Sequence, residues 1–218
     1  MGEKRKIYLV RHGTPEGNLV NFCGITDYKL SELGKKEASA SGKYFAALGF
    51  NGKFYSSPMS RSFDTGKIIA KEIESVNPNI KFDIKIKDLF IELNFGLVEN
   101  ISIEQFKKEH PAETMLWMSD FYNQPFPEGE SFKDCGNRFC QGLAEVLAEN
   151  KDNNDDIIIT AHMCVIEGYL IGKGFLKADM NCLANPIHCA SITTLTEDES
   201  GNLTCDGIGY FPKEYMVD

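Results

Sequence analysis

Short apolar segments rich in β-branched residues alternate along the chain with longer segments in which apolar residues recur at helical spacing. The short segments predict buried strands at residues 7–10, 53–57, 80–86, 157–160, 190–196 and 203–210. Pro58 ends the second of these strands, and residues 199–202 predict a turn between the last two.

The longer segments predict amphipathic helices at residues 33–48, 59–75 and 131–150. The stripe of the first helix contains Leu33, Glu37 or Ala38, Ser41, Phe45 and Leu48, and Gly49 is expected to end it. The apolar stripe of the last helix contains Phe132, Cys135, Phe139, Leu143 and Val146 or Leu147. Strand and helix in alternation predict an α/β fold, a three-layer sandwich with a mainly parallel central sheet and helices on both faces.

The chain shows no internal repeat, linker or low-complexity segment, so we expect residues 1–218 to form a single domain. Residues 100–130 are rich in aromatic side chains and are interrupted by Pro111, Pro125 and Pro127. This stretch predicts a small helical insertion that caps a site.

Composition narrows the class of protein. The 218 residues are 42% hydrophobic and 25% charged, as in an ordinary soluble globular protein. The net charge of −9 argues against a nucleic-acid partner and against an anionic membrane surface. No apolar run approaches the roughly 18 residues that a membrane span needs, and the run at residues 7–10 is too short for a signal peptide. We therefore expect a cytoplasmic protein without a membrane partner.

Seven cysteines occur without a Cys-x-x-Cys pair, which favours reduced thiols in a chain expected to stay in the cytoplasm. A zinc site would have to combine His162 with Cys164 and His188 with Cys189, and no regular ligand spacing supports it. We expect neither a metal nor a cofactor.

Residues suited to binding an anion follow three of the predicted strands. Arg11 and His12 follow the first strand, Arg61 follows the second, and His162 follows the strand at 157–160. Ligands of open α/β sheets bind beyond the carboxyl ends of the strands, so these side chains are expected to meet. Two arginines and two histidines in an acidic protein predict an anion site.

The same residues belong to a longer ordered set of motifs. The set contains Arg11-His12-Gly13 with Asn18, the stretches 24–27 and 30–34, Ser57 to Arg61 with Thr65, Glu92 to Gly96 with Glu99, and Ala161-His162. In its order and spacing over residues 5–195, this set resembles the histidine phosphatase superfamily, which includes the cofactor-dependent phosphoglycerate mutases.

Within that superfamily, the motifs are similar to those of small phosphatases. Pro127 to Ser131 before a long helix and Phe95-Gly96 after the acid look like the small phosphatases, and residues 191–193 are similar to alpha-ribazole phosphatases of cobalamin assembly. The mutases carry Arg-His-Tyr where this chain has Leu93-Asn94-Phe95. A second phosphate or a carboxylate of the substrate would therefore be poorly held.

The resemblance and the residue types together imply a role for each motif residue. His12 is expected to be the nucleophile, held neutral by the neighbouring guanidinium groups, and Glu92 is expected to be the proton donor. Arg11, Arg61 and a protonated His162 are expected to clamp the phosphoryl oxygens. The implied substrate contacts are Asn18, Cys23, Gly24 and Met163.

Other residues compete for parts of this assignment. Glu99 and Glu128 are the nearest alternatives to the proton donor and are expected to be solvated acids, and His188 could reach the site through the tail. Met163 and Cys164 stand where the family often has two glycines, which predicts an altered substrate shape with the chemistry preserved.

The sequence therefore predicts a metal-independent phosphomonoesterase that acts on a small phosphorylated metabolite, with alpha-ribazole phosphate as the leading substrate. A phosphoglycerate mutase and a broad sugar-phosphate phosphatase remain alternatives, and so does a catalytically silent phosphate-binding protein. A homodimer is left open.

Overall fold

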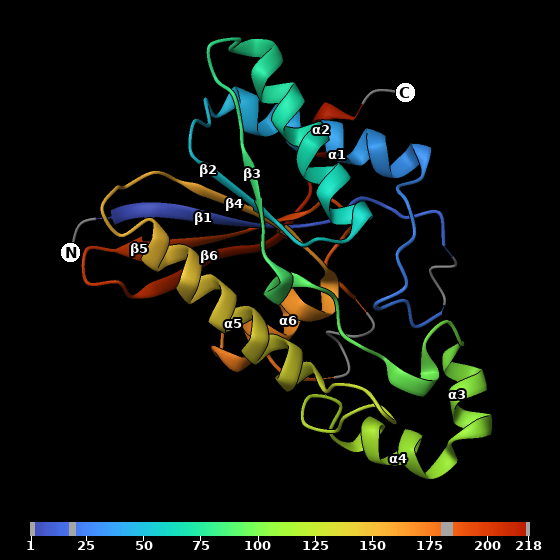
Figure 1. Cartoon of the computed structure of the whole chain (residues 1–218). Helices are drawn as coiled ribbons and strands as arrows, with labels where there is room; N and C mark the ends of the chain where they lie inside the picture. The colour runs from blue at the N-terminus through green and yellow to red at the C-terminus, as the bar shows by residue number, and fades with distance from the viewer. Residues whose placement is uncertain (1–2, 18–20, 180–184, 217–218) are drawn as a thin grey trace.

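The computed structural model describes residues 3–17, 21–179 and 185–216. Within these residues, six strands form one sheet in the order β3-β2-β4-β1-β5-β6 (Figure 1). The strands are β1 (Glu3–Arg11), β2 (Lys53–Ser56), β3 (Ile84–Ile86), β4 (Ile157–Ala161), β5 (Ile192–Asp198) and β6 (Leu203–Tyr210). The first four pair in parallel and the last two are antiparallel to their neighbours, so the sheet is mainly parallel as predicted.

The central strands bury side chains on both faces of the sheet. In β1, Ile7 and Leu9 belong to one core cluster, whereas Tyr8 and Val10 belong to the other. All five residues of β4 are buried. Burial on both faces explains the continuous apolar runs from which the sequence predicts these two strands.

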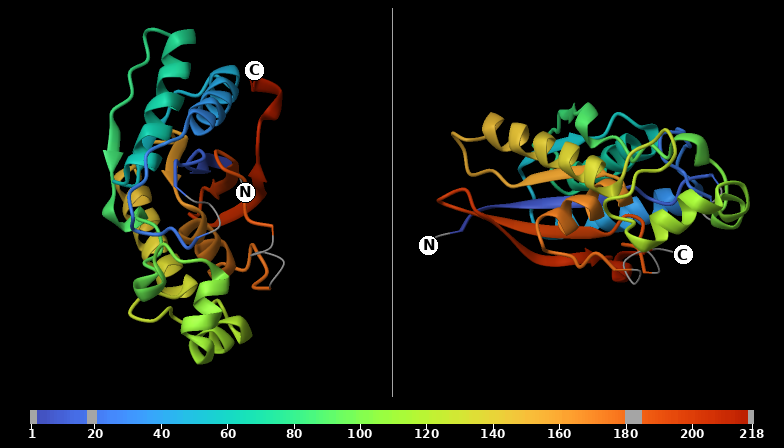
Figure 2. Two further views of the ribbon diagram at one scale, coloured as in Figure 1. Left: turned by 90° about the vertical axis from the view of Figure 1, so that its right-hand side faces the viewer. Right: turned by 90° about the horizontal axis from the view of Figure 1, so that it is seen from below.

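Two pairs of helices form the outer layers. The helices α1 (Glu32–Ala47) and α2 (Ser60–Val76) pack together on one face of the sheet, and α5 (Phe132–Glu149) and α6 (Met163–Gly172) pack together on the other (Figures 1 and 2). The predicted three-layer α/β architecture is confirmed. In the part of the chain that the structure describes, no helix is long and apolar enough to cross a membrane.

Serine side chains begin α1 and α5. Ser31 accepts the amide N–H of Gly34, and Ser131 accepts that of Asp134, whose carboxylate accepts the Ser131 amide in return. Such caps satisfy amide groups that the first helical turn leaves without partners. The predicted stripe of α5 is buried and consists of Phe132, Cys135, Phe139, Leu143 and Val146.

The stripe predicted for α1 is wrong at both ends. Leu33 and Leu48 are each 51% exposed, whereas Phe45 between them is fully buried. The inward face begins at Gly34, where a side chain would collide with the carbonyl oxygen of Thr14. Close contact with the loop after β1 therefore requires a small residue on this face and turns the two leucines outward.

Two further elements differ from the predicted pattern. The strand predicted at residues 80–86 is confined to Ile84–Ile86, because only three residues of the short strand β2 pair with it. The amide of Ile80 donates to Asn77 in a turn instead. The sequence pattern does not reveal α6, since eight of its ten residues are buried and a continuous apolar run shows no helical period.

Between β3 and α5 the chain forms a helical insertion at one end of the molecule (Figure 1). The insertion contains α3 (Ile103–Glu109) and α4 (Pro111–Ser119). Short 3-10 turns lie at Asp88–Phe90 (η1), Gly96–Val98 (η2) and, near the C-terminus, Lys213–Tyr215 (η3). The ring of Phe22 lies 5.0 to 6.1 Å from those of Phe95, Phe106, Trp117 and Phe126. This aromatic cluster fixes the insertion against the loop after β1.

The packing of α5 on α6 leaves no room for a side chain at Gly136. A Cβ atom there would lie 2.3 Å from the carbonyl carbon of Gly168. Gly136→Ala is therefore expected to lower the free energy of unfolding by about 1–3 kcal/mol, the usual range for overpacking, as measured by chemical denaturation. Gly207→Ala is the control, since no atom lies within 4 Å of its added Cβ. Equal effects of the two substitutions would contradict the prediction.

Candidate active site

The loops that follow β1, β2 and β4 meet at the carboxyl edge of the sheet. Arg11 at the end of β1 pairs with Ala161 at the end of β4, so His12 and His162 leave the sheet side by side. Their ring centroids are 5.1 Å apart. Arg61 comes from the first turn of α2, and its Nε lies 3.3 Å from Nε2 of His12. The structure therefore brings together the two arginines and two histidines of the predicted anion site.

His12 is buried and held in one orientation. Its amide donates to the carbonyl oxygen of Ala161, and its Nδ1 lies 2.7 Å from the carbonyl oxygen of Gly13. Because a carbonyl oxygen only accepts, Nδ1 carries the hydrogen and Nε2 keeps its lone pair. Burial, followed by the charges of Arg61 and Arg11, lowers the pKa of His12 well below its ordinary value of 6.5. The neutral ring is the form that can act as a nucleophile.

Arg61 is 1% exposed, and backbone carbonyl groups hold its guanidinium group. Its Nη1 donates to Thr26 at 2.8 Å, and its Nη2 donates to Gly24 at 2.6 Å. Gly24 has no room for a side chain, because a Cβ atom would lie 2.0 Å from the carbonyl oxygen of Leu93. Gly24, a predicted substrate contact, thus lies behind Arg61 and orients it.

His162 is fully buried at the end of β4. Its Nε2 lies 2.8 Å from the hydroxyl oxygen of Ser57. Burial, followed by the charges of Arg61 and His12, lowers the pKa of His162 well below 6.5. In the protein without a ligand, burial among cations therefore disfavours a positive charge on His162, and the protonated form expected on the bound phosphoryl group stays a prediction. A phosphate dianion beside the ring would raise this pKa.

Glu92 lies in an irregular segment between η1 and η2. Its Oε1 accepts the amide N–H groups of Leu93 at 2.9 Å and Val165 at 3.2 Å, and its Oε2 accepts that of Cys164 at 3.3 Å. Burial raises the pKa of Glu92, against the lowering effect of these amides and of Arg61. The same burial thus favours a neutral imidazole and a protonated carboxyl group, the states that a nucleophile and a proton donor require.

A cavity of about 280 Å³ opens onto Arg11, His12, Arg61 and Glu92. The fully buried His162 is not part of its lining among the described residues. The rest of its wall includes Phe22, Cys23, Phe95, Ile103, Met163 and Cys164. The predicted contacts Cys23 and Met163 therefore line the cavity, whereas the predicted contact Asn18 lies outside the described residues.

The motifs and the geometry agree with a match over most of the chain. A sequence model of the histidine phosphatase superfamily (branch 1) matches residues 7–204. The chain belongs to this superfamily. The resemblance drawn from the ordered motifs is thereby confirmed.

Two relatives within the superfamily are enzymes of phosphorylated sugars and glycerates. Rat 6-phosphofructo-2-kinase/fructose-2,6-bisphosphatase 1 is 27% identical over 188 residues, which make up 84% of this chain and 36% of the rat protein. The 2,3-bisphosphoglycerate-dependent phosphoglycerate mutase of Nitrobacter winogradskyi is 32% identical over 133 residues, 60% of this chain and 62% of the mutase. The matched part of the chain thus spans less than two thirds of either relative.

Solved structures share the fold over almost the whole chain. A mutant of phosphoserine phosphatase from Entamoeba histolytica, in complex with phosphoserine, has a TM-score of 0.79 at 20% identity and covers 98% of this chain and 100% of its own. A candidate alpha-ribazole-5'-P phosphatase from Escherichia coli has a TM-score of 0.74 at 16% identity and covers 94% of this chain and 96% of its own. At these identities the similarity shows the common fold.

The remaining candidates, two acids and the histidine near the C-terminus, differ from one another in their surroundings. Glu99 accepts two amide N–H groups of residues 24–26, each at 3.0 Å, so it shapes the loop behind the buried arginine and is not the solvated acid predicted. Glu128 is exposed, as predicted. His188 is exposed, stacks on the ring of Phe211 at 4.5 Å, and lies outside the cavity lining among the described residues.

The zinc alternative gains no support from the geometry. Within residues 3–17, 21–179 and 185–216, no group of three or more His, Cys, Asp or Glu side chains is arranged to hold a metal ion. Burial raises the pKa of the Cys164 thiol well above 9.0, which disfavours the thiolate that zinc requires.

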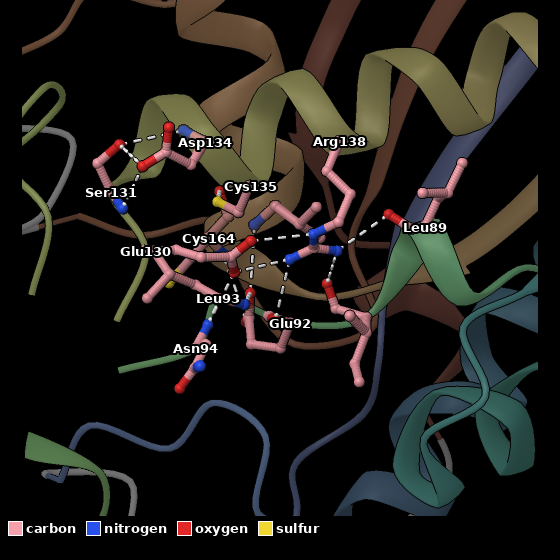
Figure 3. Close-up of polar contacts among 12 residues, drawn as sticks. Leu89, Glu92, Leu93, Asn94, Glu130, Ser131, Asp134, Cys135, Arg138 and Cys164 are labelled. Atoms are coloured by element: carbon pink, nitrogen blue, oxygen red, sulfur yellow. Dashed lines mark hydrogen bonds and ion pairs between the residues drawn. The ribbon is translucent and has the colours of Figure 1, made fainter. Parts of the chain in front are cut away.

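The sequence did not reveal the role of Arg138, which holds the backbone at the predicted proton donor Glu92. Arg138 of α5 donates to the carbonyl oxygens of Leu89, Ile91 and Glu92 and forms an ion pair with Glu130 (Figure 3). The three carbonyl groups lie 46 to 49 residues away from Arg138 in the chain. No local pattern on the helix could therefore identify them.

The burial of His12 beside two guanidinium groups has a measurable consequence. In the wild-type protein, the imidazole of His12 is expected to titrate well below pH 6.5 and to be neutral above that pH. Arg61→Met removes a neighbouring positive charge, which favours the imidazolium form, so this substitution should raise the pKa of His12. NMR titration of the imidazole nitrogens measures both effects. A wild-type midpoint at or above 6.5, or no rise in Arg61→Met, would contradict the assignment.

Proposed function

We propose that this chain is a metal-independent phosphomonoesterase that forms a phosphohistidine at His12. The observation that carries the proposal is the neutral His12 ring, which lines one cavity with Glu92 and whose unprotonated Nε2 accepts a hydrogen bond from Nε of the fixed Arg61. The cations that neutralise the transferred phosphoryl group are then supplied by the protein itself.

In the first step, the lone pair on Nε2 of His12 attacks phosphorus as the bond to the leaving oxygen breaks. Arg11 and Arg61 hold the phosphoryl oxygens, where the transition state spreads its negative charge. His162 joins them once the bound dianion has raised its pKa. Glu92 gives its proton to the leaving oxygen, so the alcohol leaves as a neutral molecule.

In the second step, water attacks the phosphohistidine on the face that the alcohol has left. The Glu92 carboxylate takes a proton from this water, and Nε2 of His12 regains its lone pair as phosphate forms. The reaction returns both groups to their starting states, so no cofactor is consumed.

The lining of the cavity favours a substrate with one phosphate group. Among the described residues, Arg11 and Arg61 are the only cations in the lining, since the ring of His12 is neutral. The undescribed stretches 18–20 and 180–184 contain no Lys, Arg or His in the sequence. A second phosphate or a carboxylate would therefore find no further cationic side chain, which argues against the phosphoglycerate mutase alternative despite the mutase relative.

The apolar wall of the cavity favours a leaving group with an apolar part over a plain sugar. Phe22, Phe95, Ile103 and Met163 offer hydrocarbon surface, and hydroxyl groups buried against them would lack partners. Alpha-ribazole phosphate remains our leading candidate, because its aromatic base could lie on this wall. On the same grounds as in the sequence analysis, we place the reaction in the cytoplasm.

Phosphate release tests the nucleophile. Wild-type protein is expected to release phosphate in EDTA from a panel with alpha-ribazole phosphate, p-nitrophenyl phosphate and 3-phosphoglycerate. His12→Ala should reduce release by about 10³-fold or more, the scale for loss of a nucleophile. His188→Ala is the control, since that exposed ring lies outside the cavity lining among the described residues.

Two outcomes of this experiment would favour the alternatives. Interconversion of phosphoglycerates without phosphate release would point to a mutase. Binding of inorganic phosphate by wild-type protein with no turnover of any ester would point to a silent phosphate-binding protein.

A series of n-alkyl phosphates tests the apolar wall. Each added methylene is expected to raise kcat/KM by about two- to fourfold until the cavity is filled, because binding transfers the methylene group from water to the apolar wall. Met163→Ser should flatten this dependence without changing the rate for the shortest ester. Leu33→Ser, at an exposed leucine on α1, is the matched control. A flat dependence in the wild-type protein would contradict an apolar leaving-group site.

A further inference from the structure

Arg138 on α5 uses all five of its guanidinium N–H groups on neighbouring chain segments (Figure 3). Its Nη1 donates to the carbonyl oxygens of Leu89 at 3.0 Å and Ile91 at 2.7 Å, and its Nη2 donates to that of Glu92 at 3.2 Å. Its Nε and Nη2 donate to the Glu130 carboxylate at 3.1 and 2.9 Å. One side chain thus joins α5 to three peptide groups of the segment that ends at Glu92.

Glu130 extends this contact to the other side of Glu92. Its carboxylate accepts the amide N–H of Asn94 at 3.0 Å, and its own amide donates to the Asn94 carbonyl oxygen at 2.8 Å. Arg138 and Glu130, which we call the bracing pair, therefore hold the backbone both before and after Glu92.

The segment around Glu92 depends on such contacts because it lacks regular secondary structure. Residues 91–95 belong to no helix or strand, so no ladder of backbone hydrogen bonds fixes them. The carboxyl group of Glu92 accepts the amide N–H of its neighbour Leu93 and those of two residues at the start of α6. The backbone and the carboxyl group of one residue are thus set by two helices, α5 and α6, that pack against each other.

The ion pair by itself does not account for this arrangement. The side chains of Arg138 and Glu130 are 19% and 26% exposed, so their charge attraction is expected to add little stability. Three of the Arg138 partners are instead carbonyl groups of a single segment, for which the planar fork of a guanidinium group is suited. That segment ends at the proposed proton donor.

We propose that Arg138, braced by Glu130, is a positioning residue that holds Glu92 where its carboxyl group can protonate the leaving oxygen. The proposal rests on the proposed function, in which the proton moves to that oxygen as its bond to phosphorus breaks. Misplacement by about 1 Å can reduce such a step by about 100-fold. The phosphate clamp of Arg11 and Arg61 does not involve the bracing pair.

This role has a signature that a merely structural role lacks. An alkyl phosphate needs its leaving oxygen protonated, whereas the nitrophenolate of p-nitrophenyl phosphate leaves without a proton. The ratio of kcat/KM for p-nitrophenyl phosphate to that for n-propyl phosphate therefore reports on the proton donor. Because kcat/KM covers only the steps up to the phosphohistidine, later hydrolysis does not affect the ratio.

The experiment measures this ratio in full-length variants. Arg138→Met is expected to lower kcat/KM for n-propyl phosphate by about 100-fold and for p-nitrophenyl phosphate by less than about threefold, since only the first ester uses general acid catalysis. Arg138→Lys keeps the charge without the fork and should give an intermediate ratio, and Glu130→Gln should change it in the same direction.

Arg5→Met is the matched control. Arg5 is another buried arginine that pairs with an acid, Glu197, and donates to the backbone carbonyl of Asn150, but it lies at the opposite end of β1 from the site. Its loss should change stability and leave the ratio as in wild type. If Arg138→Met does not fold, Arg138→Lys and Glu130→Gln decide by the same ratio.

An unchanged ratio in the folded bracing-pair variants would overturn the proposal, whether both kcat/KM values fall equally or neither falls. Glu92→Gln separates this failure from a failure of the proposed function. If Glu92→Gln changes the ratio and the bracing-pair variants do not, only the positioning role is wrong. If Glu92→Gln leaves the ratio unchanged, Glu92 is not the proton donor, and the proposal falls with that assignment.

Discussion

The parallel register of β1, β4 and β2 is the constraint on which the site depends. Thr160 of β4 lies opposite Val10 of β1 on one side and opposite Ser56 of β2 on the other. The three loops therefore leave the sheet at the same level, and the residues that follow can meet. A shift of one strand by one residue would turn its side chains to the opposite face, so His12 and His162 could no longer lie together.

Burial gives the groups of this site their different protonation states. The two histidine rings lose their charge because they are buried beside guanidinium groups, and Glu92 is shifted toward its protonated form. Carbonyl groups of the loop after β1 hold the guanidinium group of Arg61 in place. The site thus offers a fixed guanidinium group, an unprotonated imidazole nitrogen and a proton to the same ligand.

Much of this could be predicted from local sequence. Apolar runs and helix periods predicted the order of most elements, and the rule that ligands bind beyond strand ends placed the motif residues together. The prediction failed for features that depend on neighbours distant in the sequence. Leu33 faces outward because Gly34 must contact the loop after β1, and α6 shows no period because it is buried all round. The pKa of His162 is lowered by its burial and by the cations packed around it.

The sequence by itself determined the α/β order of the chain, the superfamily motifs and the residue types of the site, because each is encoded within one segment. Only the tertiary structure decided which groups hold those residues in place. The guanidinium group of Arg138 reaches carbonyl groups 46 to 49 residues away, and the carboxyl group of Glu92 reaches amides 72 and 73 residues away. Such contacts arise when α5 and α6 pack on the sheet, and no pattern within a single segment records them.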